Sequence, residues 1–132
     1  MSQENVEIAR RVVAAFDRRD RAAWLALQDE DLEVIPIGDW PEQGISGREA
    51  AWDFYTRTLD TFEDSPLTVV NVIDAGADSV LQHHRRRLRG RASGADVVFD
   101  YWVVATIRGR KIIRNEWFAD RAKALEAVGL SE

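Results

Sequence analysis

The chain contains no cysteine, so disulfide bonds, thiol catalysis and cysteine-ligated zinc or iron–sulfur sites are excluded. Basic residues are too few for general nucleic-acid binding, because 18 Lys and Arg stand against 23 Asp and Glu, giving a net charge of -5. No apolar run approaches the length of about 18 residues that a membrane-spanning helix needs. The N-terminal residues also lack the apolar segment of a signal peptide. We therefore expect a cytoplasmic protein with no nucleic-acid or membrane partner.

What the chain does contain is the composition of an ordinary globular protein. Hydrophobic residues make up 45% and charged residues 31% of the 132 residues. A chain of this length can bury a substantial core but has little room for a second one. We therefore expect a single domain that covers residues 1–132.

The first half of the sequence has helical periodicity. Apolar residues recur every three or four positions behind Ser2, which predicts a first helix, and Asp20 is placed to cap a short second helix. A strand-like segment follows from Leu32 to Ile37, and the segment Asp39 to Gly47 is typical of a loop. The pattern Ser46-Gly-Arg-Glu49 then predicts a capping box at the start of a third helix.

From Leu67 onward, apolar and polar residues alternate with a period of two. The predicted strands, separated by glycine-containing turns, cover about residues 67–74, 79–90, 95–107 and 111–119. Asp120 is placed to cap a final short helix, which is expected to end at Gly129. Helices and one strand followed by an antiparallel meander indicate the α+β class.

Two segments resemble a known superfamily. They are the end of the first predicted helix, Arg10 to Asp20, and the segment Phe99 to Asp120, where two long β-type runs meet at an Arg-Gly-Arg turn. With the order of the other elements, they resemble the ketosteroid isomerase-like (nuclear transport factor 2-like) superfamily, particularly its SnoaL-like branch. The resemblance implies a cystatin-like α+β cone, in which a curved antiparallel sheet wraps around the N-terminal helices and encloses one deep pocket. It also implies a homodimer.

The catalytic positions that the resemblance identifies hold the wrong side chains here. The Asp general base of the isomerases falls on Ile35, and their two oxyanion donors fall on Val12 and Val103. The Asp base of SnoaL-type cyclases falls on Trp117. A valine or isoleucine side chain can neither take a proton from carbon nor donate a hydrogen bond to an enolate. The known reactions of the superfamily are therefore not expected, and the catalytic residues stay unknown.

The resemblance assigns other side chains to the pocket. Its strand register turns His83 and Arg85 inward and leaves His84, Arg86 and Leu88 outward, because side chains alternate across a strand. A slip of one residue would exchange the two sets. The ligand-binding residues predicted in this way are Tyr55, His83, Arg85, Tyr101, Asn115 and Trp117.

Two consequences follow from that register. Ile113 and Ala119 are expected to face inward together with Asn115, since they alternate along the same strand. An inward Arg85 needs an anion, either a carboxylate of the protein or an acidic ligand. Arg85 is therefore predicted to anchor an anionic or carbonyl-bearing ligand, unless it faces outward and pairs with an acidic residue such as Asp100.

Three functions remain open. The first is a pocket that binds a small, partly apolar, anionic or carbonyl-bearing molecule. The second is an isomerase, cyclase or hydrolase of unassigned chemistry with His83 as general base, because histidine titrates near neutrality. The third is a dimeric scaffold whose pocket is filled by Trp117 and Tyr101. No cofactor and no metal are expected, since the adjacent His83 and His84 point to opposite faces of a strand and cannot share an ion.

Overall fold

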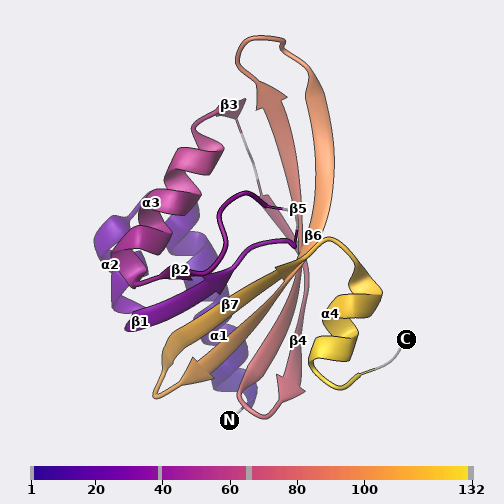
Figure 1. Ribbon diagram of the computed structural model, residues 1–132. Coiled ribbons are helices and arrows are strands. Elements are labelled where there is room, and N and C mark those ends of the chain that lie inside the picture. The colour runs from indigo at the N-terminus through magenta and orange to yellow at the C-terminus, as the bar shows by residue number, and fades with distance from the viewer. Residues whose placement is uncertain (1, 39, 65–66, 131–132) are drawn as a thin grey trace.

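Residues 2–38, 40–64 and 67–130 are described by the computed structural model in Figure 1. In chain order the elements are α1 (Ser2–Asp17), α2 (Arg21–Ala26), β1 (Gln28–Ile35), β2 (Ile45–Ser46), α3 (Arg48–Leu59), β3 (Phe62–Asp64), β4 (Leu67–Gly76), β5 (Ser79–Gly90), β6 (Asp96–Arg108), β7 (Lys111–Phe118) and α4 (Arg121–Ala127). The predicted α+β class is confirmed. The predicted loop over 39–47 contains the short strand β2, and its first residue lies outside the described residues.

Local sequence sets most helix ends as predicted. The side chain of Asp20 accepts a hydrogen bond from the backbone of α2, and that of Asp120 does the same for α4. Gly129 has a φ of 76°, the left-handed conformation that suits glycine after a helix. The predicted capping box is wrong, because Ser46 belongs to β2 and Gly47, with a φ of 94°, occupies the N-cap without a side-chain hydrogen bond.

The strands form one strongly curled sheet in the order β2-β1-β7-β6-β5-β3, with β4 also paired to β5. From β4 to β7, strands that follow one another along the chain pair antiparallel, as predicted. β1, however, runs parallel to β7, with Val34 opposite Asn115, so the sheet is mixed and not wholly antiparallel. Sequence patterns reveal hairpins between consecutive strands, whereas β1 and β7 are joined only through α3 and the rest of the sheet.

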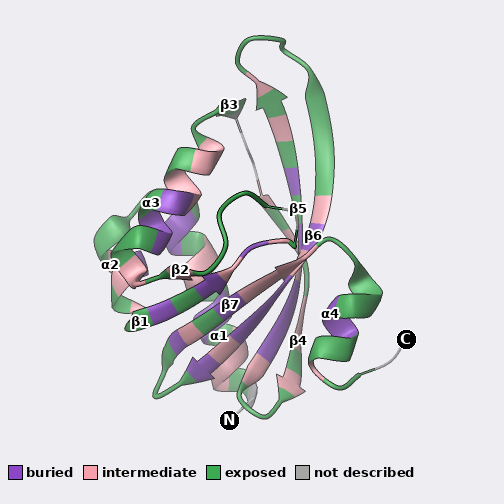
Figure 2. Ribbon diagram, in the orientation of Figure 1, coloured by how far each residue is buried: buried purple, intermediate pink, exposed green. Residues whose placement is uncertain are grey.

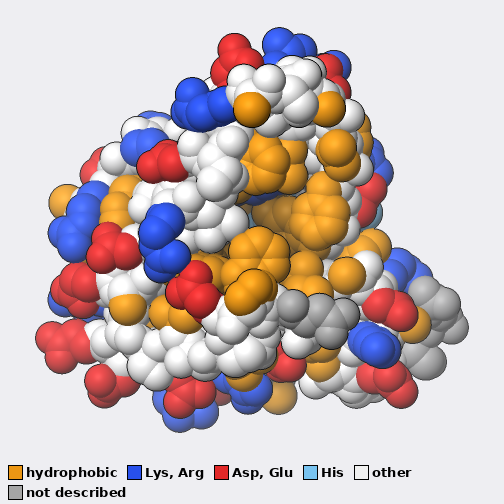
Figure 3. Space-filling view, turned by 45° about the horizontal axis from the view of Figure 1, so that its top comes forward, with side chains coloured by type: hydrophobic (Ala, Val, Ile, Leu, Met, Phe, Trp, Pro, Cys, Tyr) orange, Lys and Arg blue, Asp and Glu red, His pale blue; other side chains and the backbone are white. Residues whose placement is uncertain are grey.

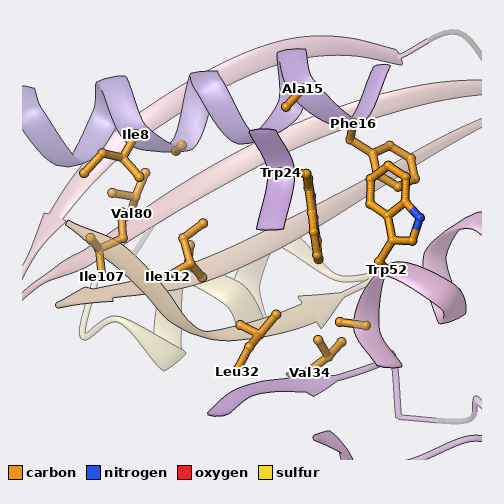
Figure 4. Close-up of a cluster of buried hydrophobic side chains, with 13 residues drawn as sticks. Ile8, Ala15, Phe16, Trp24, Leu32, Val34, Trp52, Val80, Ile107 and Ile112 are labelled. Atoms are coloured by element: carbon orange, nitrogen blue, oxygen red, sulfur yellow. The ribbon is translucent and has the colours of Figure 1, made fainter. Parts of the chain in front are cut away.

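Helices cover both faces of the sheet. α1, α2 and α3 pack on the concave face around Trp24, which is 1% exposed and lies near Phe16 and Trp52 in Figure 4. α4 packs on the convex face, where Leu125 contacts a smaller cluster around Leu81. Figure 2 shows that the far end of the β5–β6 hairpin is largely exposed, since it extends beyond both layers.

Candidate functional site

A cavity of about 340 Å³ lies between α1, α3 and the concave face of β5, β6 and β7. In Figure 3 it is a hollow surrounded mainly by hydrophobic side chains. The β5–β6 hairpin forms part of its wall through Leu88, Val97 and Phe99. Val97 is 56% and Phe99 36% exposed, so this part of the wall reaches the surface.

Aromatic rings form much of the wall. Tyr101 on β6 stacks on Trp117 of β7 with 4.8 Å between the ring centroids, and Phe99 stacks on Tyr101 at 5.4 Å. Tyr55 on α3 approaches Trp117 to 5.4 Å. Flat, apolar walls of this kind favour a flat ligand with little exposed polarity.

Arg86 supplies the cationic group of the cavity. It lies on β5, is only 8% exposed, and donates from Nε to the hydroxyl oxygen of Tyr101 at 3.2 Å. Its guanidinium carbon lies 5.9 Å from the centroid of the Phe16 ring, close enough for a cation–π contact. Burial raises the pKa of Tyr101, and the positive charge of Arg86 opposes that rise.

His84 lies next to this group and is a neutral side chain. It lies edge-on to the Tyr101 ring, and its Nε2 is 3.0 Å from Oε1 of Gln82. Because an amide oxygen only accepts, the hydrogen of the neutral imidazole sits on Nε2. Burial and, to a smaller extent, the charge of Arg86 lower the pKa of His84 to about 3, so the ring carries no charge at neutral pH.

A second polar group lies across the cavity. Trp117 donates from its indole Nε1 to the hydroxyl oxygen of Tyr55 at 3.3 Å. Burial raises the pKa of Tyr55, while the hydrogen bonds from Trp117 and Asn115 oppose that rise. Both phenols of the chain therefore stay protonated at neutral pH and can donate hydrogen bonds.

The predicted face of β5 is wrong, and the physical reason is its register with β6. Partners across the hairpin have opposite parity: Arg85 faces Asp100, and Arg86 faces Phe99. Residues directly opposite share one face of a sheet, so the inward odd-numbered residues of β6 require inward even-numbered residues on β5. His83 and Arg85 therefore do not line the cavity, whereas His84 and Arg86 do.

His83 and Arg85 belong to the convex face instead. Nε2 of His83 lies 2.8 Å and Nε of Arg85 3.0 Å from the same carboxylate oxygen of Asp100. His83 also stacks on Trp102 at 4.6 Å. Arg85 is therefore not an anchor for a ligand in the cavity, and His83 is not placed to act there as a general base.

The other predicted site residues do line the cavity: Tyr55, Tyr101, Asn115 and Trp117. On β7 the alternation is interrupted, because Thr106 pairs with Arg114 but Ile107 pairs with Ile112. This irregularity puts Ile112 and Asn115 on the cavity side, so the predicted inward orientation of Ile113 is wrong. Ala119 lies beyond the end of β7 and is exposed.

Comparison with known families now identifies the fold. The SnoaL-like domain family matches residues 9–115. The chain belongs to this family. No curated protein sequence matches it.

Solved structures similar to this SnoaL-like domain share its fold at low identity. An NTF2-like protein from Burkholderia xenovorans LB400 is 22% identical, with 89% of each chain covered and a TM-score of 0.74. TerC, co-crystallised with polyporic acid, is 20% identical, with 95% of this chain and 98% of TerC covered and a TM-score of 0.76. Rv0760c from Mycobacterium tuberculosis, in complex with estradiol-17β-hemisuccinate, is 17% identical, with 86% of this chain and 92% of that chain covered and a TM-score of 0.73.

The positions that the resemblance assigns to isomerase catalytic groups hold apolar residues in this SnoaL-like domain. Val12 and Val103 line the cavity and offer it only hydrocarbon. Ile35 is not one of the lining residues, although Pro36 and Ile37 are. Within residues 2–38, 40–64 and 67–130, no His, Asp and Glu side chains are grouped to hold a metal ion. None of the helices in that part of the chain is both long and apolar enough to cross a membrane.

Proposed function

We propose that this SnoaL-like domain binds a small, flat, largely apolar molecule with an acidic or carbonyl group. The observation that carries the proposal is Arg86, a buried guanidinium on the wall of a largely apolar cavity. Arginine presents five donors in a planar fork that matches a carboxylate. His84, neutral beside it, does not repel an incoming anion, and the carboxyl group of Asp17 is near enough to interact electrostatically with the same guanidinium.

The size of the cavity also supports binding over the filled-scaffold alternative. Its volume of about 340 Å³ lies in the lower part of the range of ligand pockets, roughly 300–1,000 Å³. Tyr101 and Trp117 stack on each other along the wall and leave this space open. Two structures of the same fold were obtained with organic molecules named as an acid and a hemisuccinate. We carry that ligand class over to this chain as part of the proposal.

The test compares two probes and two neighbouring arginines. Binding of estradiol-17β-hemisuccinate and of uncharged estradiol is measured by calorimetry for the wild type, Arg86→Met and Arg85→Met. We expect Arg86→Met to weaken the hemisuccinate roughly 10- to 100-fold, the value of a charge-assisted hydrogen bond, and to change estradiol affinity little. Arg85→Met removes the same charge from the convex face and should leave both affinities unchanged.

Two results would overturn the proposal. One is a wild-type protein that binds neither probe at concentrations up to their solubility limit. The other is an equal loss of hemisuccinate affinity in Arg85→Met and Arg86→Met, which would assign the effect to overall charge and not to the cavity.

We also infer that two copies of the chain associate through the convex face. Val98 lies on the side of β6 opposite the cavity and is 60% exposed, and Val70 on β4 is 42% exposed. The resemblance implies a homodimer, and these two exposed valines supply apolar surface that a second copy would cover. Sedimentation equilibrium should give a dimer for the wild type and for Val97→Asp, on the cavity side, but a monomer for Val98→Asp. A wild-type protein that stays monomeric at a concentration of about 0.1 mM would contradict the inference.

A further inference from the structure

The two tyrosines of the chain share an unusual hydrogen-bonding state. An indole N–H and a guanidinium N–H can only donate, so the hydroxyl oxygen of Tyr55 accepts from Trp117 and that of Tyr101 accepts from Arg86. Each phenol still carries its own hydrogen. Among the residues that the structure describes, no acceptor is bonded to either hydrogen.

Both phenols face the same space. Tyr55 and Tyr101 line the cavity, and each contacts the ring of Trp117, at 5.4 Å and 4.8 Å between centroids. They are also near enough to interact electrostatically, because Tyr101 contributes to raising the pKa of Tyr55. Two side chains that line the cavity therefore carry O–H donors, and a buried donor left without an acceptor is destabilising.

The groups that donate a hydrogen bond to each phenol oxygen also make that phenol a stronger hydrogen-bond donor. A hydrogen bond received at the oxygen draws electron density from the O–H group, so the chain Trp117–Tyr55–acceptor, and likewise Arg86–Tyr101–acceptor, is cooperative. Hydroxyls polarised in this way favour strong acceptors such as carbonyl oxygens over weak ones such as ethers.

We propose that the hydroxyl groups of Tyr55 and Tyr101, the phenol pair, bind two acceptor oxygens of a flat conjugated dicarbonyl ligand, such as a quinone. This deepens the proposed function and rests on it. The flat aromatic wall formed by Tyr101 and Trp117 favours a flat molecule, and the two donors favour oxygen acceptors on it. The phenol pair is distinct from Val12 and Val103, where the isomerases carry their oxyanion donors.

The experiment uses 2-methyl-1,4-naphthoquinone and its hydrocarbon analogue, 2-methylnaphthalene. The quinone is a clean probe here because the chain has no cysteine to react with it. Affinities are measured by fluorescence titration for the wild type, Tyr55→Phe, Tyr101→Phe and Phe99→Leu. The carbonyl stretching frequency of the bound quinone is recorded by difference infrared spectroscopy.

We expect each Tyr→Phe variant to weaken the quinone roughly five- to tenfold and the hydrocarbon less than about twofold, since only a hydrogen bond is removed. The carbonyl stretch, lowered by hydrogen bonding in the wild type, should move back up in each variant. Phe99→Leu removes part of the wall without touching a donor, so it should weaken both probes alike. Trp117→Phe leaves both phenols in place but removes one polarising N–H, and should shift the carbonyl stretch part of the way.

The outcomes separate this proposal from the proposed function. If the wild type binds neither naphthalene probe nor the hemisuccinate, the proposed function fails and the phenol pair fails with it. If both naphthalene probes bind and the Tyr→Phe variants weaken them equally, the tyrosines only pack against the ligand and the phenol pair alone is overturned. A carbonyl stretch that is the same in the wild type and Trp117→Phe, at the frequency of an apolar solvent, would overturn it even if a Tyr→Phe variant failed to fold.

Discussion

The two faces of β5 carry the same residue types in opposite circumstances. His83 and Arg85 lie on the convex face and share the carboxylate of Asp100, within reach of solvent. His84 and Arg86, each one position further along, are buried on the concave face among Gln82, Tyr101 and Phe16. Adjacent identical side chains thus form an ordinary surface ion-pair group in one case and the polar part of a cavity in the other.

The difference teaches that the chemistry of this strand is decided by burial and not by residue type. On the convex face, exposed charges are hydrated and their pairing contributes little to stability. On the concave face, desolvation keeps His84 neutral, and the low local dielectric strengthens each hydrogen bond that Arg86 donates. The experiments below test this contrast, beginning with the largest expected effect.

Acid should destabilise the protein through His84. Its pKa is lowered from 6.5 to about 3 on folding, so between these values the unfolded chain binds a proton that the folded chain does not. The contribution of His84 to the free energy of unfolding is present above pH 6.5 and is lost as the pH falls through this window. The loss amounts to about 2 kcal/mol between pH 7 and pH 5. Urea denaturation at the two pH values measures the loss. His84→Gln should remove most of this dependence, and His83→Gln should retain it; the reverse would invert the assigned faces.

Alkali should destabilise the protein through the tyrosines. Burial raises the pKa of Tyr55 and of Tyr101 above the ordinary value of 10.0, so the unfolded chain loses these protons first. Stability is therefore present below pH 10 and falls as the pH rises above it, by roughly 1 kcal/mol for Tyr55 at pH 10.5. Absorbance at 295 nm reports only these two residues, since the chain has no other tyrosine. A half-ionised signal from folded protein at pH 10 would contradict the burial of both phenols.

The convex-face carboxylate should matter less. Its contacts with His83 and Arg85 lower the pKa of Asp100, but the group is exposed. Asp100→Asn should shift the urea midpoint only slightly at low salt and not at all in 1 M NaCl, where the screening length is about 3 Å. A loss that persists in high salt would mean that the convex face is covered, and that the contrast with the concave face is smaller than the single chain indicates.

The smallest expected effect is none. Wild-type protein should isomerise 3-ketosteroids no faster than buffer. The positions that the resemblance assigns to the base and the oxyanion donors hold hydrocarbon side chains, Val12, Val103 and Ile35. A positioned base contributes roughly 10²–10⁴-fold and an oxyanion donor a similar factor, so their joint absence removes nearly all the rate. Steady-state absorbance of the conjugated product measures this. A clear rate would show that another concave-face group, such as His84, takes the role of the base.

The sequence predicts most of the fold but only part of the site. Helix caps at Asp20 and Asp120 and the tight turns are local signals, and they were read correctly because a few neighbouring residues decide them. The parallel pairing of β1 with β7 depends on segments about 80 residues apart, and no local pattern reports it. The capping box failed for a similar reason, since pairing with β1 holds Ser46 in a strand.

The site residues divide along the same line. The family resemblance predicts Tyr55, Tyr101, Asn115 and Trp117 on the cavity side, and all four line the cavity. His84 and Arg86 were missed because β5 carries charged residues on both faces, so hydrophobic alternation does not indicate its orientation. The pairing of β5 with β6 does indicate it. Because Tyr101 faces the cavity and lies opposite His84, the register of the hairpin sets the orientation of every side chain on β5.

The register of that hairpin also shapes how the domain can evolve. Because β5 holds two interleaved sets of side chains, the chain already encodes a second lining for its cavity, with His83, Arg85 and Arg87 in place of His84, Arg86 and Leu88. A one-residue insertion or deletion between the strands would shift the pairing along β5 by one residue. This single event would turn the second set of side chains toward the cavity. Such a step replaces Leu88 with Arg87 and gives the cavity a second arginine, so ligand preference in this hairpin can change by length as well as by substitution.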